Sequence, residues 1–96
     1  MKPSIALEKN REQIKKIVAR YHARNVRVFG SVVAGCDTDA SDLDLLVDIT
    51  PDTTLMDIGA IQHELKALLG IEVDVLTPNS LPEKFKNKVL KEARQV

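Results

Sequence analysis

The 96-residue chain has no tryptophan, a single cysteine, Cys36, and only 3% aromatic residues. One cysteine cannot form a disulfide within the chain, and no apolar signal segment stands near the N-terminus, so we expect a reducing, cytoplasmic location. No apolar run approaches the roughly 20 residues of a membrane-spanning helix. We therefore expect no association with membranes, and the length predicts one domain over residues 1–96.

Charge of one sign is also lacking, because fourteen basic and fourteen acidic residues cancel to a net charge of zero. Domains that bind nucleic acid typically carry a basic excess, and those that bind single strands also present aromatic rings on which bases stack. This chain has only three such rings, Tyr21, Phe29 and Phe85. Direct binding to nucleic acid is therefore not expected.

The apolar residues that are present recur at helical spacing in three stretches. Two of them predict helices over about residues 5–22 and 55–69, with Gly70 ending the second. Ser80 and Pro82 predict the start of a third helix. Four of its apolar side chains are expected to face inward: Phe85, Val89, Leu90 and Ala93.

Shorter runs of β-branched and alternating residues predict strands over 26–29, 43–49 and 71–76. Between the first two strands, residues 31–41 are small, polar and acidic, and their start suits one helical turn. Because a helix connects the second and third strands, we expect these strands to be parallel. The order of elements predicts an α/β (α+β) fold with a small mixed sheet flanked by helices.

Two aspartates, Asp42 and Asp44, stand at the start of the strand predicted over 43–49. Alternation places both on one face, about 7 Å apart along the strand, where their charges repel. Such a pair is usually no more than an exposed polar face. Here, however, Asp74 lies inside the next predicted strand, where it could complete a cluster of three carboxylates. Carboxylate oxygens are ligands for Mg²⁺, and two such ions about 3.5–4 Å apart stabilise phosphoryl transfer.

A glycine–serine pair, Gly30-Ser31, ends the first predicted strand, and a tight turn there suits a phosphate group. Ten residues separate Ser31 from the triplet Asp42-Leu43-Asp44. This spacing resembles the motif of the nucleotidyltransferase superfamily related to DNA polymerase β. The segment Val28-Phe29-Gly30-Ser31 is similar in sequence to the minimal nucleotidyltransferase branch of this superfamily, and the resemblance extends over nearly the whole chain.

The resemblance implies a Mg²⁺-dependent transfer of AMP from ATP, with pyrophosphate leaving. Asp42, Asp44 and Asp74 would be the catalytic and metal-binding residues, holding two Mg²⁺ ions, with Asp74 also helping to deprotonate the attacking hydroxyl. Gly30 and Ser31 would bind the triphosphate. Members of this branch are commonly antitoxins whose partner is a helical ribonuclease toxin of the HEPN class, and some place AMP on a hydroxyl of that toxin.

One difference from the family concerns the loop after the glycine–serine pair, where relatives often carry arginines. This chain has Val32, Val33 and Ala34 there, followed by an acidic stretch. Fixed positive charge beside a triphosphate aids both binding and catalysis. Two alternatives therefore stay open: an antitoxin with little or no activity that neutralises its partner by binding, and, with less support, an enzyme that modifies a small molecule such as an antibiotic.

Overall fold

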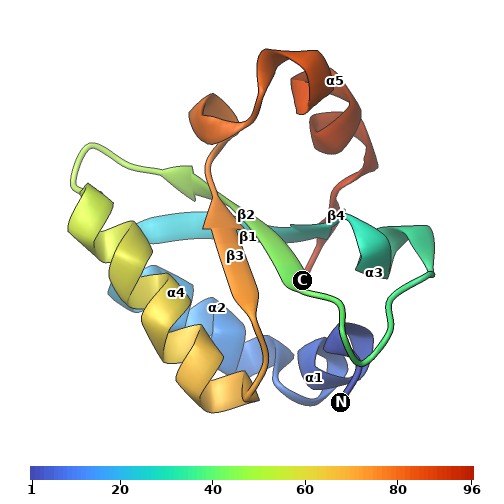
Figure 1. Ribbon diagram of the computed structural model, residues 1–96. Coiled ribbons are helices and arrows are strands. Elements are labelled where there is room, and N and C mark those ends of the chain that lie inside the picture. The colour runs from blue at the N-terminus through green and yellow to red at the C-terminus, as the bar shows by residue number, and fades with distance from the viewer.

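Four strands form one mixed sheet in the computed structural model, which describes residues 1–96 (Figure 1). The strands are β1 (Ala23–Phe29), β2 (Leu43–Ile49), β3 (Val73–Leu76) and β4 (Arg94–Gln95). Their order across the sheet is β3-β2-β1-β4. β1 is antiparallel to both β2 and β4, whereas β2 and β3 are parallel. The predicted mixed sheet and the parallel pair within it are confirmed.

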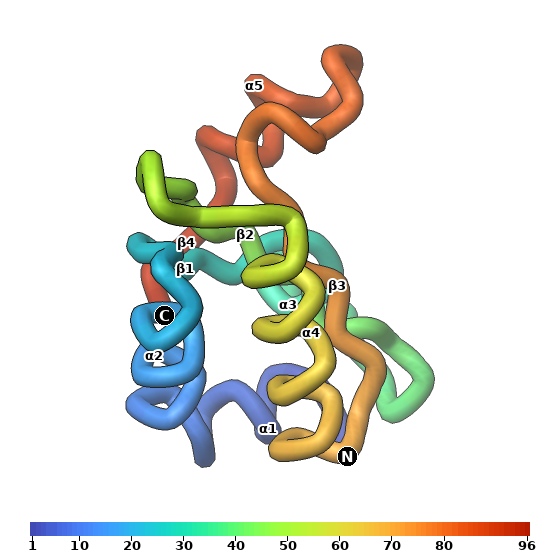
Figure 2. The backbone as a smooth tube through the Cα atoms, turned by 90° about the vertical axis from the view of Figure 1, so that its left-hand side faces the viewer, coloured from blue at the N-terminus to red at the C-terminus, as the bar shows by residue number.

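The helices are divided between the two sides of the sheet. They are α1 (Pro3–Lys9), α2 (Arg11–Arg20), α3 (Ser31–Ala34), α4 (Leu55–Leu69) and α5 (Glu83–Glu92), with a 3₁₀ turn, η1 (Pro78–Ser80). Figure 2 shows α1, α2 and α4 below the sheet and α5 alone above it. None of the helices has the length and apolar character needed to cross a bilayer.

The main core lies between the sheet and the helices α2 and α4. Ile14 and Val18 of α2, Leu65 of α4 and Leu45 of β2 are buried there. β2 and β3 contribute through alternate residues, as their patterns predicted. Leu46 of β2 is fully buried as well, but it lies outside this cluster. Because neighbouring strand residues point to opposite faces, Leu46 belongs to the side of the sheet that faces α5.

Helix α4 has well-defined ends that fix its position. Thr54 accepts a hydrogen bond from the Asp57 N–H at 3.1 Å, and Asp57 accepts one from the Thr54 N–H at 2.9 Å, so the two residues form a capping box. At the other end Gly70 has φ +67°, a conformation that glycine adopts without strain. The predicted bounds of this helix are confirmed.

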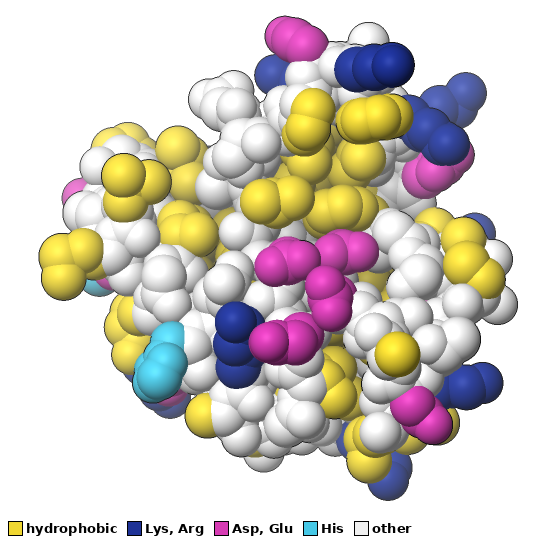
Figure 3. Space-filling model, in the orientation of Figure 1, with side chains coloured by type: hydrophobic (Ala, Val, Ile, Leu, Met, Phe, Trp, Pro, Cys, Tyr) yellow, Lys and Arg dark blue, Asp and Glu magenta, His cyan; other side chains and the backbone are white.

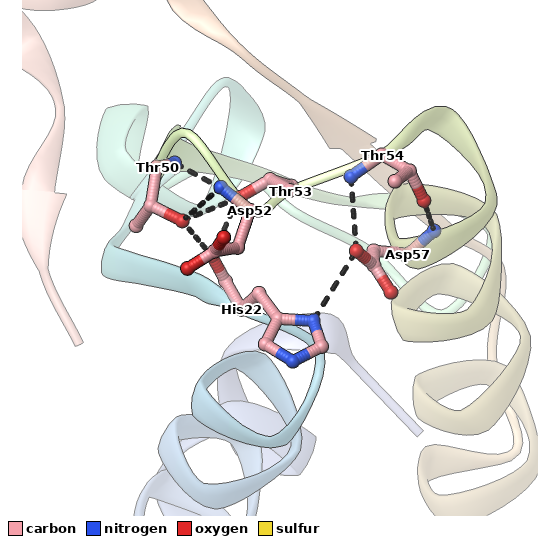
Figure 4. Close-up of polar contacts among 6 residues, drawn as sticks. All are labelled: His22, Thr50, Asp52, Thr53, Thr54 and Asp57. Carbon is pink, nitrogen blue, oxygen red and sulfur yellow. Dashed lines mark hydrogen bonds and ion pairs between the residues drawn. The ribbon is translucent and has the colours of Figure 1, made fainter.

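His22 ties the turn before α4 to the junction between α2 and β1 (Figure 4). The hydroxyls of Thr50 and Thr53 donate hydrogen bonds to the His22 carbonyl oxygen at 3.0 and 2.5 Å. His22 Nδ1 lies 3.3 Å from Asp57 Oδ2. The Thr54 N–H, followed by His22, holds the pKa of Asp57 below its usual value. These contacts connect the two segments that lead into β1 and α4.

The single helix predicted over residues 5–22 is wrong, because the structure breaks it at Asn10. This residue has φ −131°, and its side-chain amide donates a hydrogen bond to the Ala6 carbonyl oxygen at 2.9 Å. The contact satisfies a carbonyl group that the end of α1 would otherwise leave without a partner. The apolar stripe continues across the break and therefore did not reveal it.

The strand bounds also differ at three places. β1 begins at Ala23 and not at residue 26, and it contains an irregularity between Arg24 and Arg27 where Asn25 has φ +54°. β3 begins at Val73 and not at residue 71. β4, whose two residues pair with β1, was not predicted because so short an edge strand has no hydrophobic pattern.

The inward orientation predicted for the apolar residues of the third helix is also wrong. α5 begins at Glu83, and none of its residues is buried. Phe85 is 52% exposed and Leu90 is 36% exposed. The helix lies over the face of the sheet that α2 and α4 do not cover. Phe85 and Val89 line a pocket there instead of filling a core.

Candidate active site

The turn after β1 requires a glycine at position 30. Gly30 has φ +75° and ψ −143°, a combination that other residues adopt only with strain. A Cβ atom built on Gly30 would also overlap Oδ2 of Asp44. Both the backbone conformation and the close approach of the carboxylate therefore favour glycine. The short helix α3 that follows confirms the single helical turn predicted there.

The sheet register brings Gly30 and two of the predicted carboxylates into one line across three strands. Phe29, directly before Gly30, is the partner of Asp44 in the antiparallel pair of β1 and β2. Asp44 is in turn the partner of Asp74 in the parallel pair of β2 and β3. Asp42 comes directly before β2. The expected proximity of Asp44 and Asp74 is therefore confirmed, although their chemical roles stay predictions.

Acidic side chains gather at the centre of the face shown in Figure 3. Burial, followed by the neighbouring charges of Asp74 and Asp42, raises the pKa of Asp44 to about 6. None of these three carboxylates forms an ion pair with a cation of the chain. Glu72 differs from them, since it pairs with Lys66 at 3.3 Å. The three aspartates thus present negative charge that the protein itself does not balance.

This uncompensated charge fits a divalent cation that also takes ligands from outside the protein. The structure contains no group of three His, Cys, Asp or Glu side chains arranged to hold a metal ion by themselves. Mg²⁺ usually binds through one or two carboxylates and completes its shell with water and substrate phosphates. Asp42, Asp44 and Asp74 offer the required oxygen atoms, so the donor set fits Mg²⁺ that arrives with a nucleotide better than a closed protein site.

The loop that connects α3 to β2 supplies no cation to this site. Two of its acidic residues, Asp37 and Asp39, contact the N-terminal segment. Asp37 accepts a hydrogen bond from the Ser4 N–H at 2.9 Å, and Asp39 lies 3.6 Å from the amino group of Met1. The Ser31 carbonyl oxygen accepts a hydrogen bond from the Cys36 N–H at 3.0 Å, which closes the turn. Ser31 itself is half-buried beside Gly30.

A pocket of about 430 Å³ beside Gly30 was not predicted from the sequence. It lies between the end of β1 and helix α5, and hydrophobic side chains gather next to the acidic group on this face (Figure 3). Phe85, Lys88 and Glu92 line it from α5. Their spacing of three, four and seven residues is a signal for one helix face, but it does not tell whether that face meets a core or a ligand.

A strand–turn unit with glycine beside paired carboxylates, on a small mixed sheet, defines a nucleotidyltransferase fold. The chain matches the family model described as polymerase beta, nucleotidyltransferase, over residues 12–96. It therefore belongs to this family. The predicted resemblance to minimal nucleotidyltransferases is confirmed by a similar structure, which is described below.

Three similar proteins illustrate the relationship. The protein adenylyltransferase MntA of Thermococcus cleftensis is 36% identical over 81% of this chain and 79% of its own length. A solved structure of a candidate minimal nucleotidyltransferase is 38% identical, with a TM-score of 0.85 over 97% of this chain and 95% of that one. A toxin–antitoxin structure with AMP-PNP shares the fold at 20% identity, with a TM-score of 0.75 over 90% of this chain and 71% of that one.

Proposed function

We propose that this nucleotidyltransferase transfers AMP from ATP to a hydroxyl group of a partner protein, and that it acts as the antitoxin of a toxin–antitoxin pair. The observation that carries the proposal is the alignment of Gly30, Asp44 and Asp74 across three adjacent strands. It is supported by the similarity to a protein adenylyltransferase and by the shared fold with a toxin–antitoxin structure that contains AMP-PNP.

Each residue of the site has a distinct role in this proposal. Asp42 and Asp44 would hold Mg²⁺ that arrives with the triphosphate, and their mutual repulsion would then be offset. Asp74, exposed on the neighbouring strand, is the third ligand and accepts the proton of the attacking hydroxyl. Gly30 lets the chain approach Asp44 closely, and Ser31 offers its hydroxyl to the phosphates. When bound, Mg²⁺ supplies positive charge where the phosphoryl oxygens become more negative.

The chemical step is a displacement at the α-phosphorus of ATP. The partner's hydroxyl oxygen forms a new bond to this phosphorus, the bond to the bridging oxygen of the β-phosphate breaks, and pyrophosphate leaves. The hydroxyl proton passes to a carboxylate, for which we propose Asp74. Most of the rate enhancement comes from positioning and from electrostatic stabilisation, since the protein forms no covalent bond to the substrate.

The partner in this proposal is a helical toxin of the HEPN class. The side of the site around Asp42 and Asp74 is open, because both residues are exposed at the edge of the acidic group. An attacking hydroxyl carried by another protein can therefore reach it.

The test is transfer of radioactive label to the product of the neighbouring gene. The protein, Mg²⁺ and the partner are incubated with ATP labelled at the α-phosphate, and we expect label on the partner. ATP labelled at the γ-phosphate should give none, because AMP and not phosphate is transferred. Asp42→Asn and Asp44→Asn should each abolish labelling. Asp52→Asn is the matched control, since its exposed side chain lies in the turn before α4, outside the site.

A second candidate function is neutralisation of the partner by binding alone. The observation in its favour is the loop from Val32 to Asp39, which carries no arginine to balance a triphosphate. If the wild-type protein blocks the partner but leaves it unlabelled, and Asp44→Asn blocks it equally well, binding alone is the function. Loss of neutralisation in the unlabelled Asp44→Asn protein contradicts that alternative.

A further inference from the structure

Helix α5 presents an unusual face to the candidate site. Phe85, Lys88, Val89 and Glu92 all line the pocket that also contains Gly30. No residue of α5 is buried, and Phe85 is 52% exposed even though it lies over the sheet. An aromatic ring left in solvent beside a hydrophobic pocket gives up burial energy that a bound ligand would recover.

We infer that this pocket binds the nucleoside part of the donor nucleotide, with the base against Phe85 and with Lys88 beside the phosphates. The inference rests on the proposed function, because it takes the triphosphate to lie at Gly30. Since Gly30 belongs both to the phosphate turn and to the wall of the pocket, the pocket is continuous with the site where the phosphates would bind. Its volume of about 430 Å³ lies within the range of about 300–1,000 Å³ typical of small-molecule sites.

The residues that line the pocket suit both the base and the phosphates of a nucleotide. Leu81, which is buried, and the ring of Phe85 both line the pocket, and a nucleobase stacks favourably on such a surface. Lys88 is the only cationic residue of the lining, and it forms no ion pair within the chain. Glu92, one turn further along, is the only acidic side chain there.

Lys88 also accounts for the missing arginines. The loop after Ser31 carries no positive charge, whereas α5 places an unpaired ammonium group in the pocket that contains Gly30. Lys91 and Arg94 line a neighbouring hollow with Lys88, beside Val33 and Ala34 of α3. In this inference Lys88 of α5 supplies the positive charge that the loop lacks.

Two ligands separate the roles of Phe85 and Lys88. Binding of the ATP analogue AMP-PNP and of inorganic tripolyphosphate, each with Mg²⁺, is measured by calorimetry. Phe85→Ala should weaken AMP-PNP binding about tenfold, the effect of losing one stacking contact, and should leave tripolyphosphate binding unchanged. Phe85→Tyr should bind AMP-PNP as the wild type does. Lys88→Gln should weaken both ligands about five- to tenfold, because both carry phosphates.

Lys86→Gln is the matched control, because it removes the same charge from the same helix outside the pocket. Lys84 is unsuitable, since its ammonium group lies 6.0 Å from the centre of the Phe85 ring. If Phe85→Ala binds AMP-PNP like the wild type, or weakens both ligands equally, the nucleoside does not lie against α5 and the inference is wrong. If the wild type binds neither ligand, the proposed function is wrong as well as this inference. Equal losses in Lys86→Gln and Lys88→Gln contradict the role of Lys88.

Discussion

Replacing Asp44 with asparagine should stabilise the metal-free protein at neutral pH while abolishing its activity. Asp44 is half-buried on β2, beside Asp74 and near Asp42, and no cation of the chain offsets its charge. Burial and the two neighbouring carboxylates raise its pKa to about 6 in the folded protein. An asparagine of nearly the same shape removes the charge and keeps the packing against Gly30.

The size of the effect follows from the pKa. A change from the ordinary value of 3.8 to about 6 corresponds to roughly 3 kcal/mol, at about 1.4 kcal/mol for each pKa unit. Because Asp44 is only half-buried, solvent screens part of this interaction, and we expect about 1–2 kcal/mol. The raised pKa means that the folded state binds the extra proton. The stability associated with that proton is complete below the unfolded-state pKa and is lost as pH rises through about 6.

The assay is urea unfolding of the wild type and of Asp44→Asn in EDTA, at pH 7.5 and pH 4.5. The variant should be more stable by about 1–2 kcal/mol at pH 7.5, and the difference should fall to roughly half at pH 4.5. Comparing the two proteins at each pH removes the contributions of other acidic groups. A variant that is less stable than the wild type at pH 7.5 would refute the reasoning, since it would mean that the ionised carboxylate stabilises the fold.

Four further substitutions test other parts of the structure by urea unfolding. Gly30→Ala should destabilise the protein by about 2 kcal/mol or more, because of its positive φ and the overlap with Asp44. Gly59→Ala should instead stabilise the protein by about 0.5–1 kcal/mol, because a Cβ atom at this position of α4 would meet only open space. A loss of stability in this variant would contradict that expectation. Thr54→Ala should cost about 1 kcal/mol through the lost cap, and an unchanged stability excludes that role. Leu46→Ala should cost about 2–5 kcal/mol, whereas a loss below 1 would mean that its side of the sheet is not closely packed.

The parts of the fold that could be predicted are those whose local signals agree. Helix α4 combines a regular apolar stripe with a cap at Thr54 and a glycine at position 70, and each signal indicates the same bounds. β2 combines alternation with a turn on either side. The break at Asn10 could not be predicted, because the side-chain contact with Ala6 leaves the spacing of the apolar stripe unchanged. β4 depends on the edge that β1 offers, which is a property of the assembled sheet.

The candidate site divides in the same way. The motif indicated Gly30 and the carboxylates, and parallel pairing then predicted that Asp44 and Asp74 are neighbours. The pairing of Phe29 with Asp44, which brings Gly30 against that carboxylate, depends on a register between strands that no local pattern specifies. The sequence does not show what the face of α5 meets, because a core helix and a helix over a ligand pocket have the same apolar spacing.

The exposed helix α5 has a consequence for how this protein can change. Both of its ends are anchored, at buried Leu81 before it and through the pairing of β4 with β1 after it, yet it buries no residue of its own. Substitutions along its inner face therefore affect the free energy of unfolding far less than substitutions in β1 or β2. The chain thus separates a segment that tolerates variation from strands that do not. New ligand preferences can arise on α5 without loss of the fold.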